Sequence, residues 1–172
     1  MSILIDGHNL IPKIAGLSLD DPQDEVKLIL ALQEYCRLRG KQLEVYFDKA
    51  PAGQAGTRKY GMVTAHFVRQ GRTADQAIQA RLVRLGKQAA NYCVVSSDRQ
   101  VQAAARSARA KVLSAEEFAA EMATANEHGN LPLGEKPPSE LSESEVEAWL
   151  EVFKPKTARP KNRRGSEPNR QD

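Results

Sequence analysis

The sequence predicts an α/β fold of three layers, with a mostly parallel central sheet of about five strands between two layers of helices. Short apolar runs typical of buried strands alternate along the chain with longer segments that show helical spacing or helix caps. Strands joined by helical crossovers run parallel, because the crossover returns the chain to the same edge of the sheet. The 172 residues are enough for one such domain and an appendage.

Five segments have the composition of strands in this sheet, being apolar and bounded by turn-forming residues. They cover residues 2–5, 43–47, 63–68, 91–96 and 111–113. The intervening segment 50–61, APAGQAGTRKYG, is rich in glycine and small residues and has a basic, aromatic end. This composition predicts a long loop, and long loops are often functional.

Four helices are expected between and after these strands, over 21–40, 73–86, 98–108 and 114–124. Asp21 and Pro22 are typical of a helix start, and Asp98 is placed as an N-cap. Capping boxes are predicted where Thr73 precedes Gln76 and where Ser114 precedes Glu117.

The chain divides by charge near its carboxyl end. Residues 137–153 carry five glutamates and no basic residue, whereas 154–172 carry seven basic residues and two acidic ones. We therefore predict a domain over 1–128, a linker and acidic amphipathic helix over 129–153, and a disordered basic tail over 154–172.

Composition excludes several classes of protein. No apolar run reaches the ~20 residues of a membrane span, and the opening MSILIDGHNL lacks the basic start and cleavage site of a signal peptide. We expect a cytoplasmic protein with no membrane partner. Cys36 and Cys93 have no CxxC or Cys/His partner, which argues against zinc and favours buried free thiols.

Four aspartates follow strands at the same end of the predicted sheet. Asp6 and Asp48 each end a strand, Asp98 follows the fourth strand, and Asp75 lies in the first turn of the helix after the third. The carboxyl ends of parallel strands share one edge, and open α/β sheets bind ligands outside that edge. Each aspartate alone would also suit a cap or a turn, so their joint placement is the evidence for a site.

Carboxylates that lie so near one another need a cation to offset their repulsion. Oxygen-only ligands suit Mg²⁺ or Mn²⁺. We expect one such ion, held by Asp6, Asp75 and Asp98, and leave a second ion open. An ion in this place could activate water against a phosphodiester. The haloacid-dehalogenase type of phosphatase is excluded, because His8 stands where its second aspartate would be, and a dinucleotide site is excluded by the absence of GxGxxG.

The segments IDGHNLI (5–11), FD (47–48), TAD (73–75) and SSD (96–98) occur in this order on the expected elements. Together they resemble the NYN-domain branch of the PIN-like nucleases, and within it the YacP-like proteins. The resemblance covers residues 1 to about 125. It implies a PIN-like sheet, a Mg²⁺ or Mn²⁺ site and RNA cleavage, and some YacP-like proteins are ribosome-associated endoribonucleases.

The predicted catalytic residues are Asp6, Asn9, Asp48, Asp75 and Asp98. Asn9 is expected to orient Asp6 or bind a metal-bound water, and a general-base role for His8 is the weaker alternative to a loop residue. The family often has an acid directly after the third of these aspartates, where Gln76 stands here. Two functions therefore remain: a metal-dependent endoribonuclease, or a catalytically decayed module that binds RNA or the ribosome.

Basic residues gather around the predicted loop and the exit of the third strand. We predict contact with single-stranded RNA through phosphates and base stacking. The residues expected to make it are Lys49, Arg58, Lys59, Tyr60 and Arg72, with Arg69 nearby. Arg81, Arg84 and Arg106 are expected on the solvent faces of helices.

Overall fold

The computed structural model describes residues 1–129, which belong to one compact unit. Strands and helices alternate along this part of the chain as the sequence predicts. The predicted linker after Gly129, the acidic amphipathic helix and the basic tail lie outside the described residues.

The central sheet has six strands in the order β3-β4-β2-β1-β5-β6. Neighbouring strands are parallel, except that β3 runs antiparallel to β4. The strands are β1 (Ser2–Asp6), β2 (Leu43–Ala50), β3 (Gly56–Tyr60), β4 (Val63–Arg69), β5 (Tyr92–Val95) and β6 (Lys111–Leu113). The mostly parallel sheet is confirmed, with one strand more than expected.

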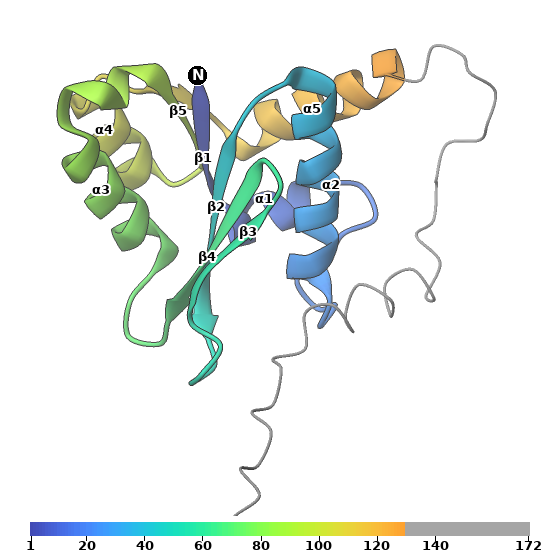
Figure 1. Ribbon diagram of the computed structural model, residues 1–172, viewed down its shortest axis with the longest axis horizontal. Helices are drawn as coiled ribbons and strands as arrows, with labels where there is room; N and C mark the ends of the chain where they lie inside the picture. The colour runs from blue at the N-terminus through green and yellow to red at the C-terminus, as the bar shows by residue number, and fades with distance from the viewer. Residues whose placement is uncertain (130–172) are drawn as a thin grey trace, which may run out of the picture. The chain divides into compact units, whose positions relative to one another are not determined.

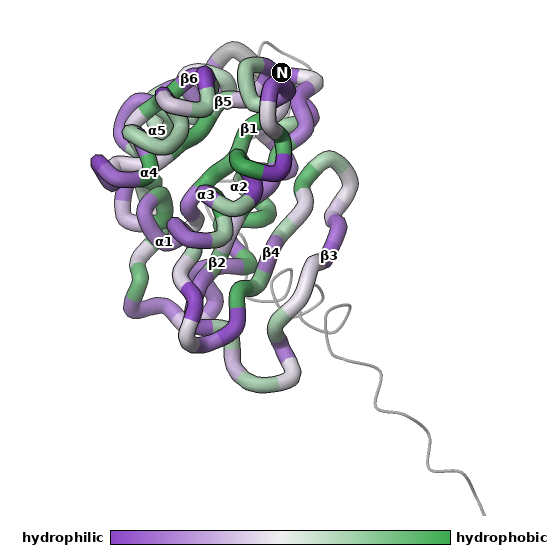
Figure 2. Tube along the Cα trace, turned by 90° about the vertical axis from the view of Figure 1, so that its left-hand side faces the viewer, coloured by the Kyte–Doolittle hydropathy of each residue, from purple (hydrophilic) through white to green (hydrophobic). Residues whose placement is uncertain are grey.

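The extra strand β3 corrects the prediction of a long loop over 50–61. Residues 56–60 pair with β4 along its free edge, and a short turn is all that remains of the loop. Their side chains are mostly exposed, so the segment lacks the apolar alternation that would mark a half-buried strand. An edge strand can be this polar because its partner supplies backbone hydrogen bonds whatever the side chains. Figure 2 shows this contrast: β1 is drawn in the green of hydrophobic residues, whereas β3 is largely in the white and purple of less hydrophobic and hydrophilic ones.

Helices cover both faces of the sheet and confirm the three layers (Figure 1). One layer holds α2 (Asp24–Arg39) and α5 (Ala115–Gly129), and the other holds α3 (Ala74–Leu85) and α4 (Arg99–Ser107). The predicted capping boxes begin α3 and α5. Three short helices were not predicted, because so few residues show no periodicity: α1 (Gly7–Leu10), η1 (Ile11–Lys13) and η2 (Gly86–Asn91). Within residues 1–129, none of the helices is long and apolar enough to cross a membrane.

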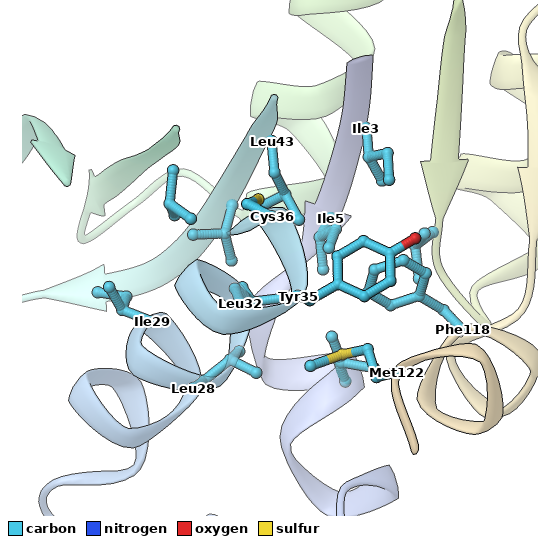
Figure 3. Close-up of a cluster of buried hydrophobic side chains, with 14 of the residues drawn as sticks. Ile3, Ile5, Leu28, Ile29, Leu32, Tyr35, Cys36, Leu43, Phe118 and Met122 are labelled. Atoms are coloured by element: carbon cyan, nitrogen blue, oxygen red, sulfur yellow. The ribbon is translucent and has the colours of Figure 1, made fainter. Parts of the chain in front are cut away.

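The larger core lies between the sheet and the layer of α2 and α5 (Figure 3). Tyr35 is fully buried there, with its ring edge-on to Phe118 and its hydroxyl donating to Glu121 Oε1 at 2.6 Å. Strand β1 is buried on both faces: Ile3 and Ile5 face this core, whereas Leu4 faces α3 and α4. Cys36 and Cys93 are buried free thiols, as expected.

Strand β1 lies at the point where the strand order reverses. From β1 the chain adds β2 and β4 on one side, then returns through α3 to place β5 on the other side. Helices that leave neighbouring strands in opposite directions open a crevice at the carboxyl ends of those strands. Asp6, the last residue of β1, lies at this crevice.

Candidate functional site

Asp6 is a buried carboxylate held at the start of α1. Its side chain is only 6% exposed and accepts a hydrogen bond from the backbone of Asn9 at 3.3 Å. The Asn9 side-chain amide also donates to Asp6 Oδ2, at 3.5 Å. Asn9 thus lies beside Asp6 and fixes its orientation, the geometry expected from the sequence.

Gly7 lets the chain turn into α1 directly against β2. A side chain at this position would place its Cβ 2.6 Å from Phe47 Cδ1 and 3.0 Å from the carbonyl oxygen of Tyr46. Real Cβ atoms essentially never lie 2.6 Å from a ring carbon, so packing requires glycine at position 7. This close approach holds Asp6 at the carboxyl edge next to the strand that carries Asp48.

Asp75 provides the second acid of the site and is half-buried. The pKa of its carboxyl group is raised to about 7, first by burial, then by its hydrogen-bond contact with Asp6, and further by the negative charges of Asp6, Asp98 and Asp48. Two carboxyl groups can share a hydrogen bond only when one of them carries a proton. The structure therefore brings Asp6 and Asp75 into contact and places the other two acids within electrostatic range.

One oxygen of Asp75 is left without a partner. Oδ1 is buried, and no donor in the described part of the chain reaches it. Buried carboxylate oxygens are normally satisfied, so such an atom calls for a proton, a water or a cation. The same side chain is in contact with a second acid, Asp6.

Asp98 begins α4 as its N-cap, as predicted. Its Oδ1 accepts hydrogen bonds from the backbone of Gln100 at 2.7 Å and of Val101 at 3.1 Å. The hydroxyl of the buried Ser96 accepts a hydrogen bond from the backbone N–H of Asp98 at 3.1 Å. Both capping bonds use the same carboxylate oxygen. A structural role at Asp98 is thus compatible with a second role for Oδ2.

Asp48 has a basic partner that sequence reasoning did not place. His8 Nδ1 lies 2.6 Å from Asp48 Oδ1, and His8 Nε2 lies 3.3 Å from Glu25 Oε1. Hydrogen bonding to Glu25 raises the pKa of His8 most, burial opposes this, and Asp48 raises it further, to about 8. His8 therefore gives Asp48 a neighbour that can carry positive charge. Glu25 comes from the start of α2, a contact with no signal in the sequence.

Gln76, which stands where the family often has an acid, is used for capping. Its side-chain oxygen accepts a hydrogen bond from the backbone N–H of Thr73 at 3.2 Å, and the Thr73 hydroxyl accepts one from the backbone of Gln76. The side chain is exposed and directed to the helix start. Gln76 therefore adds no ligand to the acids of the crevice.

The donor set fits a hard divalent cation. Asp6 and Asp75 bring carboxylate oxygens together, one of them buried and unsatisfied, and Mg²⁺ needs only one or two carboxylates because it retains several waters. Across residues 1–129, no group of three or more acidic, histidine or cysteine side chains closes around a single point. Direct ligation is thus best suited to Asp6 and Asp75, whereas Asp98, the third ligand expected from the sequence, is within electrostatic range of Asp75.

The predicted RNA-contacting residues do not form one surface. Direct cross-strand neighbours share a face of the sheet, and Arg58 pairs with Ala65 while Lys59 pairs with Thr64. On the face covered by α2, Arg58 lies 4.7 Å over the ring of Phe67, and Tyr60 packs on the core. Lys59 lies on the other face, which α3 covers. Because β3 runs back from the carboxyl edge, Tyr60 lies at the opposite end of the sheet from the acids, which corrects its predicted place among the RNA-contacting residues near the site.

Lys49 and Arg72 remain near the acids. Lys49 is exposed directly after Asp48, with a backbone φ of 60° where the pairing of β2 with β4 shifts register. Arg72 is exposed just before α3, three residues before Asp75. Both are placed to meet a polyanion that approaches the carboxyl edge.

Comparison with known proteins agrees with this geometry. The family model of the YacP-like NYN domain matches residues 3–154 of this chain. A crystal structure of Rae1 (YacP) from Bacillus subtilis is 25% identical, with a TM-score of 0.64, covering 90% of this chain and 91% of that one. A crystal structure of a mutant of the same Bacillus subtilis protein is 27% identical, with a TM-score of 0.60, covering 74% and 77% respectively. No curated protein matches.

Proposed function

Because the chain belongs to the YacP-like NYN family, we propose that it is a divalent-metal-dependent endoribonuclease that cleaves single-stranded RNA, with ribosome-associated mRNA as its substrate. The family has a nuclease-type fold, which supports the reaction class. The observation that carries the proposal is the contact of Asp6 with Asp75 at the topological switch point, where one buried oxygen has no donor.

Each residue of the crevice has a task in this proposal. Asp6 and Asp75 would hold Mg²⁺ or Mn²⁺, with Asp98 beside them, and one ion is sufficient for the ligands present. When bound, such an ion activates a water and stabilises the charge that develops on the phosphodiester. Asn9 keeps Asp6 oriented. His8 offsets the charge of Asp48, so that a phosphate approaching this edge meets less repulsion.

A second candidate is a decayed NYN module that binds RNA or the ribosome without cleaving it. The observation that favours it is Gln76, whose side chain caps α3 in place of supplying an additional acid. This module would retain the basic surface but gain nothing from Mn²⁺. The two functions differ in one measurable property, namely metal-dependent turnover.

The test is cleavage of end-labelled single-stranded RNA, and of a circular RNA that has no ends, with Mn²⁺ or EDTA. We expect Mn²⁺-dependent opening of the circle by the wild type and background rates for Asp6→Asn and Asp98→Asn. Asn retains the N-cap at both positions, so folding should be preserved, which circular dichroism checks. A wild type that binds RNA but never cleaves it supports the decayed module.

Ribosome association is tested separately, by sedimentation of the full chain with ribosomes in EDTA-free buffer with no added mRNA. We expect co-sedimentation that weakens as salt increases, since ribosomal RNA is a polyanion. Ribosomes are cytoplasmic, and we therefore place the protein's action there. Absence from the ribosome pellet at low salt would contradict this part of the proposal and leave the nuclease assignment standing.

A further inference from the structure

A basic hollow lies on the α3 side of the sheet, over β4 and β3 (Figure 1 shows these elements). Its volume is about 630 Å³, and four arginines line it: Arg69, Arg72, Arg81 and Arg84. A smaller hollow of about 220 Å³ shares Glu44, Thr64 and Arg81 with the first and continues to Lys59. These two hollows together are named the arginine groove.

The one carboxylate of the groove is already neutralised. Glu44 accepts two hydrogen bonds from Arg81, at 2.7 and 3.1 Å, and one from the Tyr46 hydroxyl at 2.9 Å. His66 Nε2 also lies 3.3 Å from Glu44 Oε2. Glu44 therefore fixes Arg81 in place, as a bidentate pair does, and leaves little free negative charge in the groove.

The other three arginines differ from Arg81, which is paired with Glu44. Arg69, Arg72 and Arg84 are exposed, and among residues 1–129 none of their guanidinium groups forms an ion pair. Surface arginines usually lie among acids of opposite sign. Uncompensated arginines along a concave surface instead produce a positive potential that attracts a polyanion.

The groove begins at Arg72, just before α3, and runs along this helix. Arg72 precedes Asp75 by three residues, and Arg84 lies at the other end of the helix. Nine residues separate Asp75 from Arg84, which is about 14 Å along a helix axis. A stacked strand has one phosphate per ~3.4 Å, so the groove spans about four phosphates.

We propose that the arginine groove binds the phosphate backbone of the RNA strand on one side of the scissile bond, from Arg72 at the acids to Arg84 and Lys59 at the far end. The inference rests on the proposed nuclease function and adds the path of its substrate. It reassigns Arg81 and Arg84, which the sequence pattern placed on a solvent-facing helix surface. It also separates Lys59, on the groove side, from Arg58, on the opposite face.

The experiment measures binding of fluorescent oligouridine to the full chain in EDTA, so that cleavage does not interfere, over a range of salt concentrations. The variants are Arg84→Gln and Arg69→Gln/Arg84→Gln. Arg106→Gln is the matched control, because Arg106 is an exposed helical arginine on α4 that does not line the groove. Each lost phosphate contact should lower the log–log salt slope by about 0.7 and weaken binding several-fold.

Oligonucleotide length provides a second readout. Arg84→Gln should weaken binding of oligouridine long enough to pass from the acids along α3, and leave the binding of a dinucleotide unchanged. Equal affinity and salt slope for the groove variants, the control and the wild type would overturn the proposal. Absence of Mn²⁺-dependent cleavage by the wild type would instead overturn the nuclease function, and groove-dependent RNA binding would still be measurable.

Discussion

His8 Nδ1 lies 2.6 Å from Asp48 Oδ1, so the acid near the end of β2 has a partner that can carry positive charge. Among residues 1–129, Asp6 and Asp75 have no such partner, and their side chains are instead in contact with each other. The carboxyl edge thus contains two kinds of acid. One is balanced by an imidazole, and the other pair is balanced only when a proton or a cation is present.

The stability contributed by His8 should depend on pH. Its pKa is raised from 6.5 to about 8, so this stability is fully present below about pH 6.5 and is lost as the pH rises through 8. His8→Gln should therefore cost about 1–2 kcal/mol of unfolding free energy at pH 6 and much less at pH 9. Urea unfolding at the two pH values measures the difference. An equal cost at both would show that His8 acts by packing alone.

Asp75 should also make the metal-free protein less stable as the pH rises, but here removing the side chain should help folding. With a folded pKa of about 7 against an ordinary value near 3.8, its ionisation costs stability progressively as the pH rises from about 4 to above 7. In EDTA, Asp75→Asn should therefore be more stable than the wild type at pH 8, with the gap closing toward pH 4. Urea unfolding of both proteins across this range measures the gap, and a gap that does not change with pH would contradict the raised pKa.

Mn²⁺ should reverse the order of stability of the wild type and Asp75→Asn, because a ligand that binds only the folded state raises its stability. The melting temperature of the wild type is expected to rise with Mn²⁺ at pH 8, while that of Asp75→Asn rises much less. Glu34→Gln, which removes an exposed acid far from the crevice, serves as the control. An equal Mn²⁺ response in all three proteins would place the ion elsewhere.

Gly7→Ala should destabilise the protein by about 1–3 kcal/mol, because the new Cβ overlaps the ring of Phe47. Phe47→Leu in the same chain makes room, so the double variant should lose less than the sum of the single losses. Chemical unfolding of the four proteins completes the cycle. Strictly additive losses would mean that the ring is not the obstacle.

Two substitutions at Asp98 separate its role as the N-cap of α4 from its proposed role in cleavage. Asp98→Ala should cost about 1 kcal/mol, since the backbone N–H groups of Gln100 and Val101 lose their acceptor. Asp98→Asn should cost far less and yet abolish Mn²⁺-dependent cleavage. If the asparagine variant cleaves RNA at the wild-type rate, Asp98 is a cap and nothing more.

The two neighbours Arg58 and Lys59 test the register of β3. Lys59→Gln should flatten the salt dependence of RNA binding by about 0.7 in log–log slope, whereas Arg58→Gln should change it less, because Arg58 packs over Phe67 on the other face. Binding titrations of both variants at several salt concentrations provide the comparison. The reverse ranking would move the RNA to the α2 side.

The sequence by itself determined the parallel sheet, its helix caps and the edge at which the aspartates lie. Strand β1 could be predicted because both its faces are buried, so almost every residue is apolar. Asp98 and the Thr73–Gln76 box could be predicted because a cap is made with residues two or three positions away. These features depend on local chemistry, which a single stretch of chain contains in full.

Only the tertiary structure decided which side chains act together. Strand β3 forms by pairing with a free edge, so its own polar residues carry no strand pattern. The partners His8 with Asp48, and Glu44 with Arg81, lie 40 and 37 residues apart in the chain and on different elements. Charge and hydrogen bonding act through space over a few ångström, so these contacts exist only once the sheet has set the register of its strands.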